Sequence, residues 1–530
     1  MTTKVRDMPV GIQDFGKLRR GGYLYVDKTD YVYEMARLGR PYFLGRPRRF
    51  GKSLFLTTLK AYFLGKKELF EGLYIYGVEK DWLEYPVFHF EFVGEEYTSL
   101  KHFQAALDDN LTGLEAVWGK DKVENTYARR FKGLIRRAHE KTGLGVVVLV
   151  DEYDKPLLET FNNPELNDTV RNMLKGFYGV LKGMDASLRF VFLTGVTKFA
   201  KVSVFSDLNM LVDISMDREY AGICGISEKE LLANFQPEIH ALAEDNKLTD
   251  DEAVAQLKKY YDGYHFAKES EDIYNPYSVL NTFYKKEFAY YWFQTGTPTF
   301  LVKMLQNIDF NLPRFENDIH VPVNYITDYR ADAADPVPVL YQSGYLTIKK
   351  YDSVTGLYTL GFPNEEVKYG FLNELLPVYS GKTLNDSSIS VISMMQALKK
   401  GDVGGMMTML QAFCASIPYD LPRKKQRDES YFQSLFYLIF SLMGQFVQTE
   451  VKSAVGRADA VVKTAGAIYV FEFKMDDTAT AKQALEQIEA KSYLIPYQAE
   501  GREIVKIGAA FNRKKGLLTG WETGKNNFCN

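Results

Sequence analysis

The chain has 530 residues, which is too long for one ordinary hydrophobic core, so about two to four domains are expected. Its apolar fraction of 46% and charged fraction of 25% are typical of a soluble globular protein. Its net charge of −3 excludes a general electrostatic attraction to nucleic acid, so any such binding must use a local basic patch.

Cysteine usage indicates the compartment. Cys224, Cys414 and Cys529 form no C-x-x-C pair, which argues against a zinc knuckle and a disulfide framework and fits a reducing environment. The N-terminal residues contain no apolar core of signal-peptide length. A cytoplasmic location is therefore expected.

The first part of the chain alternates β-rich apolar runs with helical patterns. The strand candidates are Tyr42–Gly45, Tyr85–Phe92, Gly145–Glu152 and Arg189–Gly195. The third is a near-continuous run of β-branched residues, as expected of a strand that is covered on both faces. Such βα alternation predicts an α/β fold with a parallel, doubly wound sheet.

The middle of the chain is mainly helical in pattern. After about Glu219 the strands are expected to stop, and residues 227–305 indicate helices. Residues 335–375 indicate a helix end, a hairpin and another helix, which fits a winged-helix-like unit. Further helices are expected to about Gln448. The uncharged run 430–449 is long enough to be weighed as a membrane span, but its glutamines and serines favour a buried helix and no membrane association.

A second, smaller α/β domain is expected at the end of the chain. Residues 456–474 indicate two strands around a short turn, residues 480–494 a helix, and residues 504–511 a last strand. The expected domains are 1–225, an α/β domain; 226–330, a helical lid; 331–380, the winged-helix-like unit; 381–430, a helical connector; and 431–530, the C-terminal α/β domain.

The first β-rich run leads into a candidate phosphate-binding loop. Gly51 would turn backbone N–H groups inward, Lys52 would reach the terminal phosphates, and Ser53 would bind Mg²⁺. Five residues, Arg46–Phe50, separate Gly45 from Gly51, whereas the usual loop has four. A plain helix start is the alternative, but a strand before the loop and an apolar helical pattern after it favour phosphate binding.

Acidic residues at the end of the third run complete this site. Asp151 would hold Mg²⁺ through water, and Glu152 would polarise the attacking water. Thr194, at the tip of the next strand, would sense the γ-phosphate, with a capping threonine as an equal alternative. The loop and the acidic pair together predict nucleotide hydrolysis.

The C-terminal strands carry a different set of residues. Glu472 and Lys474 lie two apart, so on a strand they share one face. If the two strands form a hairpin, Asp459 joins them, and two carboxylates beside a lysine can hold a divalent metal and activate water against a phosphodiester. Glu450, expected on the preceding helix, would add a ligand, and Gln487 on the next helix would reach the same cleft. An ordinary exposed Glu–Lys pair is the alternative.

Several short stretches carry a family resemblance. Those between about Gly11 and Leu280 are "GIQDF", "YVDKT", "RPRRFGKSL", "LFEGLYI", "YPV", "VLVDEYDKPL", "TGVTKF", "YYDGYHF" and "YNPYSVL". They resemble the AAA-ATPase-like family of predicted bacterial P-loop proteins. The resemblance implies ATP as the nucleotide and implies that the long loop is the family's own version. The residues expected at the nucleotide are Gly45, Arg49, Gly51, Lys52, Ser53, Leu54 and Thr194. Whether Arg46, Arg48 and Arg49 contact phosphates, a neighbouring subunit or nucleic acid stays open.

The C-terminal stretch "GRADAVV…IYVFEFK…ALEQI…Y" resembles the PD-(D/E)xK nucleases, a restriction-endonuclease-like α/β fold. The resemblance implies a site of Asp459, Glu472 and Lys474, with Glu450, Asp459 and Glu472 as ligands of Mg²⁺ or Mn²⁺. The leading hypothesis is an ATPase domain that gates a metal-dependent nuclease acting on DNA or RNA. Association of the chain into a homo-oligomer is one assembly to test. The alternative is an ATP-driven switch whose C-terminal domain binds nucleic acid or a partner without cleaving it. A nucleotide-binding scaffold without turnover is a weaker hypothesis.

Overall fold

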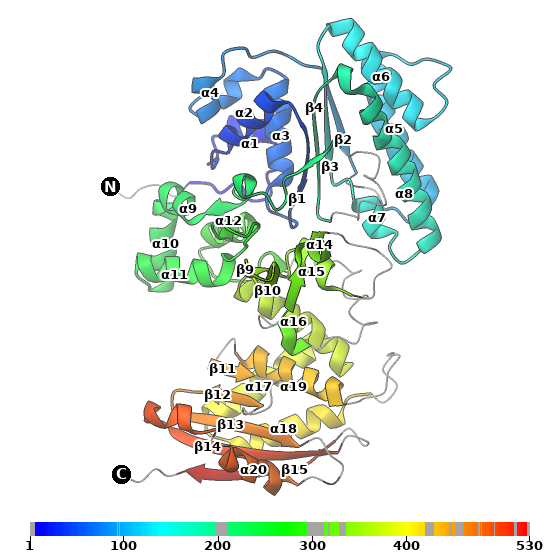
Figure 1. The fold of residues 1–530 in the computed structure, drawn as a ribbon. Coiled ribbons are helices and arrows are strands. Elements are labelled where there is room, and N and C mark those ends of the chain that lie inside the picture. Colours follow the sequence, from blue (N-terminus) through cyan, green and yellow to red (C-terminus); the bar gives the residue numbers. More distant parts are fainter. Residues whose placement is uncertain are drawn as a thin grey trace. The chain divides into compact units, whose positions relative to one another are not determined.

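The computed structural model of the chain (Figure 1) describes most of the sequence. The described residues are 6–92, 94, 96–197, 210–293, 312–315, 319–327, 335–418, 429–444, 448–451, 459–474, 478, 480–491, 493–512 and 517–526. They form two compact units, the first spanning Met1–Gly296 and Asn317–Val367 and the second spanning Thr297–Glu316 and Lys368–Asn530.

A five-stranded parallel sheet forms the centre of the first unit, as the sequence predicts. Its strands are β1 (Pro41–Gly45), β2 (Val87–Glu91), β3 (Val146–Asp151), β4 (Leu188–Gly195) and β5 (Val212–Asp213), in the order β2-β3-β4-β1-β5. Every residue of β3 is buried, which explains its continuous apolar sequence.

Helices cover this sheet on both faces (Figure 1), which confirms the doubly wound arrangement. One set comprises α1 (Phe15–Arg20), α2 (Thr29–Leu38), α3 (Lys52–Phe63) and α4 (Tyr74–Val78). The other comprises α5 (Leu100–Trp118), α6 (Tyr127–Thr142), α7 (Lys155–Glu159) and α8 (Pro164–Tyr178). Helix α3 packs on the sheet through the ring pairs Phe55–Phe192 and Phe63–Phe190. This packing fixes the start of α3, and therefore the phosphate loop, against the carboxyl end of β1.

A helical region with its own core follows the sheet. It contains α9 (Glu228–Asn234), α10 (Gln236–Asn246), α11 (Asp250–Tyr261) and α12 (Pro276–Lys285). The expectation that strands stop after Glu219 is wrong, because β6 (Ile226–Ser227) and β7 (Ile273–Tyr274) form an antiparallel pair inside this region. Strands of two residues are too short to leave an alternating pattern in the sequence.

The predicted hairpin between two helices is confirmed. Its elements are α15 (Val337–Gln342), β9 (Thr347–Asp352), β10 (Leu357–Gly361) and α16 (Glu365–Ser380). A further strand, β8 (Ile319–Pro322), pairs with β10 and is followed by α14 (Val323–Thr327), so the sheet has the order β8-β10-β9. The described part of residues 226–330 therefore ends in a strand and a short helix.

The second unit holds a mixed five-stranded sheet. Its strands are β11 (Gln448–Val451), β12 (Ala460–Lys463), β13 (Ala467–Lys474), β14 (Glu503–Asn512) and β15 (Leu517–Asn526), in chain order across the sheet. Only the β13–β14 pair is parallel, and α20 (Ala481–Ala490) connects these two strands. The helices before the sheet are α17 (Leu384–Lys399), α18 (Val403–Ala415) and α19 (Glu429–Met443).

Two expectations for this unit are wrong. Residues 504–511 are not the last strand, because β15 pairs with β14 in an antiparallel register. Glu450 is not on the preceding helix, because α19 ends at Met443 and Glu450 lies in β11 opposite Val461. The buried-helix interpretation of the uncharged run is confirmed for α19, whose Phe436 ring stacks 4.5 Å from that of Phe473. In the part of the chain that the structure describes, no helix has both the length and the apolar character to cross a bilayer.

Candidate nucleotide and metal sites

A cavity of about 680 Å³ opens in the first unit where α3 begins. Gly51, Lys52, Ser53 and Leu54 line it from the start of α3, and Glu152 lines it from the end of β3. The first turn of a helix leaves backbone N–H groups without partners in the helix, and the helix dipole adds partial positive charge there. The cavity therefore has the size of a small-molecule site and an end that favours anions.

Gly51 provides the turn that the loop requires. Its φ of +95° is in the left-handed region, which a glycine adopts without the steric cost that a side chain would add. An added Cβ at Gly51 would meet no atom within 4 Å, so the backbone conformation and not crowding accounts for the glycine. Arg49, with φ of +65°, also adopts this region. Two of the three residues immediately before α3, Arg49 and Gly51, therefore have a left-handed backbone conformation.

Lys52 is folded back onto the loop. Its Nζ donates to the carbonyl oxygens of Arg46 at 3.0 Å and Pro47 at 2.9 Å, and its side chain is buried. Burial lowers the pKa of Lys52, and the nearby carboxylates of Glu152 and Asp151 oppose this effect. The ammonium group thus lies at the cavity wall. A phosphate oxygen bound there would take the place of the Arg46 and Pro47 carbonyl oxygens as its acceptor.

Ser53 and Asp151 meet between α3 and β3. The Ser53 hydroxyl donates to the carboxylate of Asp151, and burial raises the pKa of Asp151 against the effects of this bond and of Lys52. The backbone N–H of Glu152 donates to Asp151 Oδ1 at 3.0 Å. Glu152 has φ of +49°, a strained conformation for a residue with a side chain, at the point where the chain turns out of the strand. A hydroxyl, a buried carboxylate and a cavity-lining carboxylate are therefore adjacent.

The loop arginines have different surroundings. Arg46 is fully buried: Nη1 donates to Ser215 O at 2.6 Å, Nη2 donates to Tyr220 O at 3.0 Å, and the guanidinium lies over the Phe266 ring at 4.1 Å. Arg46 therefore holds segments of the first unit together. Arg48 and Arg49, in contrast, line the cavity.

Two of the expected nucleotide contacts lie inside the sheet. Gly45 is part of β1, and its N–H donates to Ser215 Oγ at 2.8 Å. Thr194 is fully buried in β4, and its hydroxyl donates to the Leu44 carbonyl at 2.9 Å. Neither residue lines the cavity. In this arrangement Thr194 joins β4 to β1.

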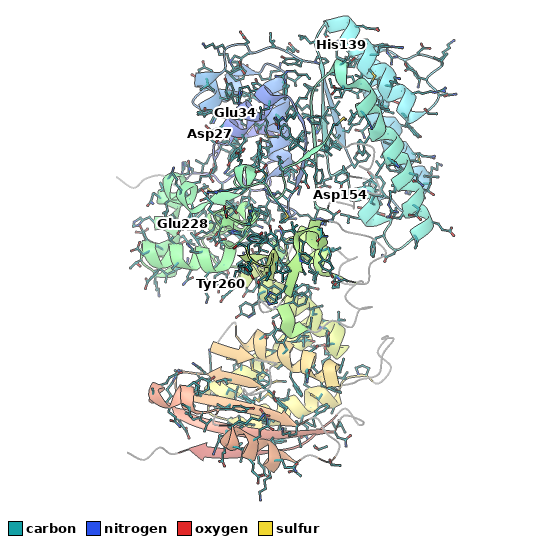
Figure 2. The ribbon with its side chains drawn as sticks, viewed as in Figure 1. Asp27, Glu34, His139, Asp154, Glu228 and Tyr260 are labelled. Atoms are coloured by element: carbon teal, nitrogen blue, oxygen red, sulfur yellow. The ribbon has the colours of Figure 1, made fainter. Side chains whose placement is uncertain are left out.

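Asp154 is a residue whose importance sequence reasoning missed. It is buried just beyond the end of β3, near the lower end of the sheet in Figure 2. Its Oδ2 accepts the N–H groups of Val196 at 3.0 Å and Thr197 at 2.6 Å and the Thr197 hydroxyl at 2.7 Å. It therefore ties the chain after β3 to the chain after β4. In the sequence, the only sign of this role is that Asp154 is the third acidic residue of "DEYD".

The C-terminal residues converge as the sequence predicts. Asp459 directly precedes β12, and its Oδ2 accepts the Phe473 N–H at 2.8 Å. Glu472 and Lys474 share a face of β13, with 3.7 Å between Lys474 Nζ and Glu472 Oε1. Gln487 on α20 hydrogen-bonds both, donating to Glu472 Oε1 and accepting from Lys474 Nζ. The side chain of Glu450 lies outside the described part of the structure.

The electrostatics of this cluster fit a divalent cation. Burial, followed by the charge of Asp459, raises the pKa of Glu472 to about 7, while Lys474 opposes the shift. Its Oε2 is buried and has no hydrogen-bond partner among the described residues. A buried carboxylate oxygen without a donor, beside a second carboxylate, is a suitable ligand set for Mg²⁺ or Mn²⁺. Within the described ranges no group of three or more His, Cys, Asp or Glu side chains forms a metal cluster.

Comparisons with known proteins agree with the two units. Residues 9–205 match the family described as "Predicted AAA-ATPase", and residues 427–521 match the family described as "PD-(D/E)XK nuclease superfamily". The fold and these matches define the class of protein: an AAA-ATPase-like domain joined in one chain to a PD-(D/E)XK nuclease-like domain. Both resemblances that the sequence carries are thereby confirmed.

One relative matches the chain over nearly the whole length of both proteins. Over 522 residues the chain is 37% identical to the "Uncharacterized protein in vnfD 5'region" of Azotobacter chroococcum mcd 1, covering 97% of this chain and 98% of the relative. The chain belongs to the family of fused predicted AAA-ATPases and PD-(D/E)XK proteins.

Proposed function

We propose that the chain binds and hydrolyses ATP with Mg²⁺ in its first unit, and that the nucleotide state controls metal-dependent cleavage of DNA or RNA by its second unit. The proposal is supported by the two family matches and by two clusters of side chains whose chemistry suits the two reactions. One cluster lies at the cavity, and the other lies on β13.

The observation that carries the nucleotide half is the cavity at the start of α3, which Lys52, Ser53 and Glu152 line, next to the buried Asp151. The N–H groups at the start of α3 and the Lys52 ammonium bind the phosphates. Ser53 and Asp151 hold Mg²⁺, directly or through water. Glu152 accepts a hydrogen bond from the attacking water and orients it.

The nuclease half is carried by the contacts among Glu472, Lys474 and Gln487 and by the proximity of Asp459. Asp459 and Glu472 hold the metal, which when bound lowers the pKa of water and offsets phosphate charge. The Lys474 ammonium stabilises negative charge on the scissile phosphate. Gln487 orients both the carboxylate and the ammonium through its amide group.

The control of one site by the other is proposed from the chain's connectivity. The boundary between the units falls inside α16, after Val367, and this helix continues to Ser380 in the second unit. A change in the first unit at the start of α16 therefore has a covalent, helical route into the second unit. The other two connections between the units, at 296/297 and 316/317, fall outside the described ranges.

The test is cleavage of DNA and RNA by the pure chain with Mg²⁺ or Mn²⁺, with and without ATP. The Lys474→Ala variant is compared with Lys482→Ala, a matched loss of an exposed lysine on α20. Cleavage that ATP alters, that Lys474→Ala abolishes and that Lys482→Ala retains supports the proposal. ATP hydrolysis without cleavage of any substrate would instead support the ATP-driven switch, in which the second unit binds nucleic acid or a partner.

A further inference from the structure

Two consecutive arginines of the phosphate loop are held from outside the loop. The Arg48 carbonyl accepts a hydrogen bond from the Trp292 indole Nε1–H at 3.0 Å. The Arg49 guanidinium lies 4.2 Å from the centre of the Tyr277 ring, on the first turn of α12. Both arginines, Tyr277 and Trp292 line the cavity. The helical region therefore fixes the segment of the loop that carries positive charge.

One buried carboxyl group contacts both of the segments that hold these arginines. Glu366, in the first turn of α16, is completely buried. Its Oε1 accepts the Trp292 backbone N–H at 2.8 Å, and its Oε2 lies 2.7 Å from the Ser278 hydroxyl oxygen. Trp292 bonds Arg48, and Ser278 directly follows Tyr277. Each oxygen of Glu366 thus secures the segment that holds one of the two arginines.

We propose that Glu366 is a positioning residue of the nucleotide site: through Trp292 and the start of α12 it holds Arg48 and Arg49 at the cavity, where they bind the phosphates of the nucleotide. This inference rests on the proposed ATP-binding function and adds the residues that set its affinity. Glu366 touches neither the cavity nor the phosphates, so its effect reaches the nucleotide only through its two neighbours.

The surroundings of Glu366 favour its neutral acid form. Burial raises its pKa to about 8, although Ser278 and the N–H groups of Trp292 and Tyr291 oppose the shift. In the structure the Trp292 N–H donates to Oε1 and the Ser278 hydroxyl donates to Oε2. A glutamine side chain keeps a partner for both groups, because its oxygen accepts the Trp292 N–H and its NH2 donates to the Ser278 oxygen once the hydroxyl has turned.

Among the described residues, the titratable groups that face Glu366 supply no positive charge. From α11 and the segments on either side of α12 these are Tyr261, Tyr264 and Tyr291, whose own pKa values Glu366 raises. On its own helix, Glu365 pairs with Lys259 at 3.2 Å. Loss of the Glu366 proton above about pH 8 therefore places an uncompensated charge in this core, which loosens the contacts that it secures.

The experiment measures the dissociation constant of a fluorescent ATP analogue and the KM and kcat of ATP hydrolysis, at pH 7 and pH 9. Trp292→Phe keeps an aromatic ring but removes the bond to Arg48. Glu366→Gln is the isosteric variant. Trp82→Phe is the matched control, because the Trp82 indole N–H has no hydrogen-bond partner in the described structure and Trp82 does not line the cavity.

The expected result for Trp292→Phe is a dissociation constant and KM about threefold to tenfold higher, with kcat little changed, because one hydrogen bond that positions the loop is lost. Trp82→Phe should bind as wild type. Glu366→Gln should bind as wild type at pH 7 and should lack the extra weakening that wild type shows at pH 9. If the contacts of Glu366 served only the stability of the fold, the variants would have lower thermal stability. They would not show a raised KM together with an unchanged kcat.

The outcomes separate the inference from the proposed function. If wild type binds no ATP, the proposed function fails. If wild type binds ATP and Lys52→Ala does not, but Trp292→Phe binds as tightly as wild type, the positioning role of Glu366 is overturned. A Glu366→Gln variant with the same alkaline weakening as wild type also overturns it. Glu366→Gln keeps the core volume at Glu366, whereas Trp292→Phe makes a buried ring smaller, so a thermal unfolding curve of each variant accompanies the binding measurement.

Discussion

Asp154 and Thr197 are joined by two hydrogen bonds, from the Thr197 N–H at 2.6 Å and from its hydroxyl at 2.7 Å, both to Asp154 Oδ2. The pair connects the chain just after β3 with the chain just after β4. Those are the strands whose ends carry the acidic pair and the predicted sensor position. A bond between adjacent strand ends is a direct way to keep Asp151 and Glu152 at a fixed distance from the next loop.

Asp154→Ala should therefore destabilise the first unit by about 2–4 kcal/mol, because three donors lose their buried acceptor. Chemical denaturation followed by fluorescence measures the change. Asp168→Ala, an exposed acid on α8, is the control and should change stability little. Equal stability of Asp154→Ala and wild type would show that solvent replaces the lost acceptor.

Lys52→Ala should abolish nucleotide binding, because it removes the only lysine at the start of α3 that lines the cavity among the described residues. Equilibrium binding of labelled ATP measures the effect. Lys132→Ala removes an exposed lysine from α6 and controls for charge. Unchanged binding by Lys52→Ala would exclude the assignment of residues 45–54 as the phosphate loop.

Glu152→Gln should keep ATP binding and lose hydrolysis by about a hundredfold or more, because an amide is a far weaker base toward water than a carboxylate. The glutamine can adopt the same left-handed backbone at the same steric cost. Single-turnover hydrolysis together with binding measures both effects. Wild-type turnover would mean that another residue orients the water.

Lys474→Ala should abolish cleavage of nucleic acid and leave the fold intact, because Lys474 is only partly buried and its main partners are Gln487 and Glu472. Cleavage of a labelled substrate and a thermal unfolding curve measure the two expectations. Cleavage at the wild-type rate would indicate a contaminant or a different site.

Glu472 should make the stability of the metal-free protein depend on pH. Its folded pKa of about 7 lies above the ordinary value of 4.5, so the folded state keeps a proton that the unfolded state releases. The stabilising contribution is full below about pH 4.5 and is lost as the pH rises to about 7. In that window the free energy of unfolding should fall by up to about 1.4 kcal/mol per pH unit.

Two comparisons check the Glu472 prediction. Glu472→Gln should remove this dependence, and Mg²⁺ or Mn²⁺ at neutral pH should restore stability to wild type but not to the variant, because the metal binds the folded carboxylate. Unfolding curves between pH 4.5 and 7, with metal and with a chelator, provide the measurement. An identical pH dependence in Glu472→Gln would place the titrating group elsewhere.

The local sequence pattern was sufficient to predict the helices and strands that carry most of the candidate site residues. Strands β1 to β4, the start of α3, the β12–β13 hairpin and α20 follow from apolar runs and turn residues, and the E-x-K spacing places Glu472 and Lys474 on one face. Pattern failed for β6, β7, β8, β11 and β15. The first two are very short, and β15, "LLTGWETGKN", lacks a regular apolar alternation because it lies at the edge of its sheet.

The sequence by itself determined the two domain families and the order of their candidate site residues, because each short motif lies within a single loop, strand or helix. Only the tertiary structure decided that Arg46 is buried while Arg48 and Arg49 reach the cavity, since an irregular loop has no period from which side-chain direction follows. It alone brought Glu366 to Trp292 and Ser278, 74 and 88 residues away. Contacts across such separations depend on how whole elements pack, which no local pattern of residues specifies.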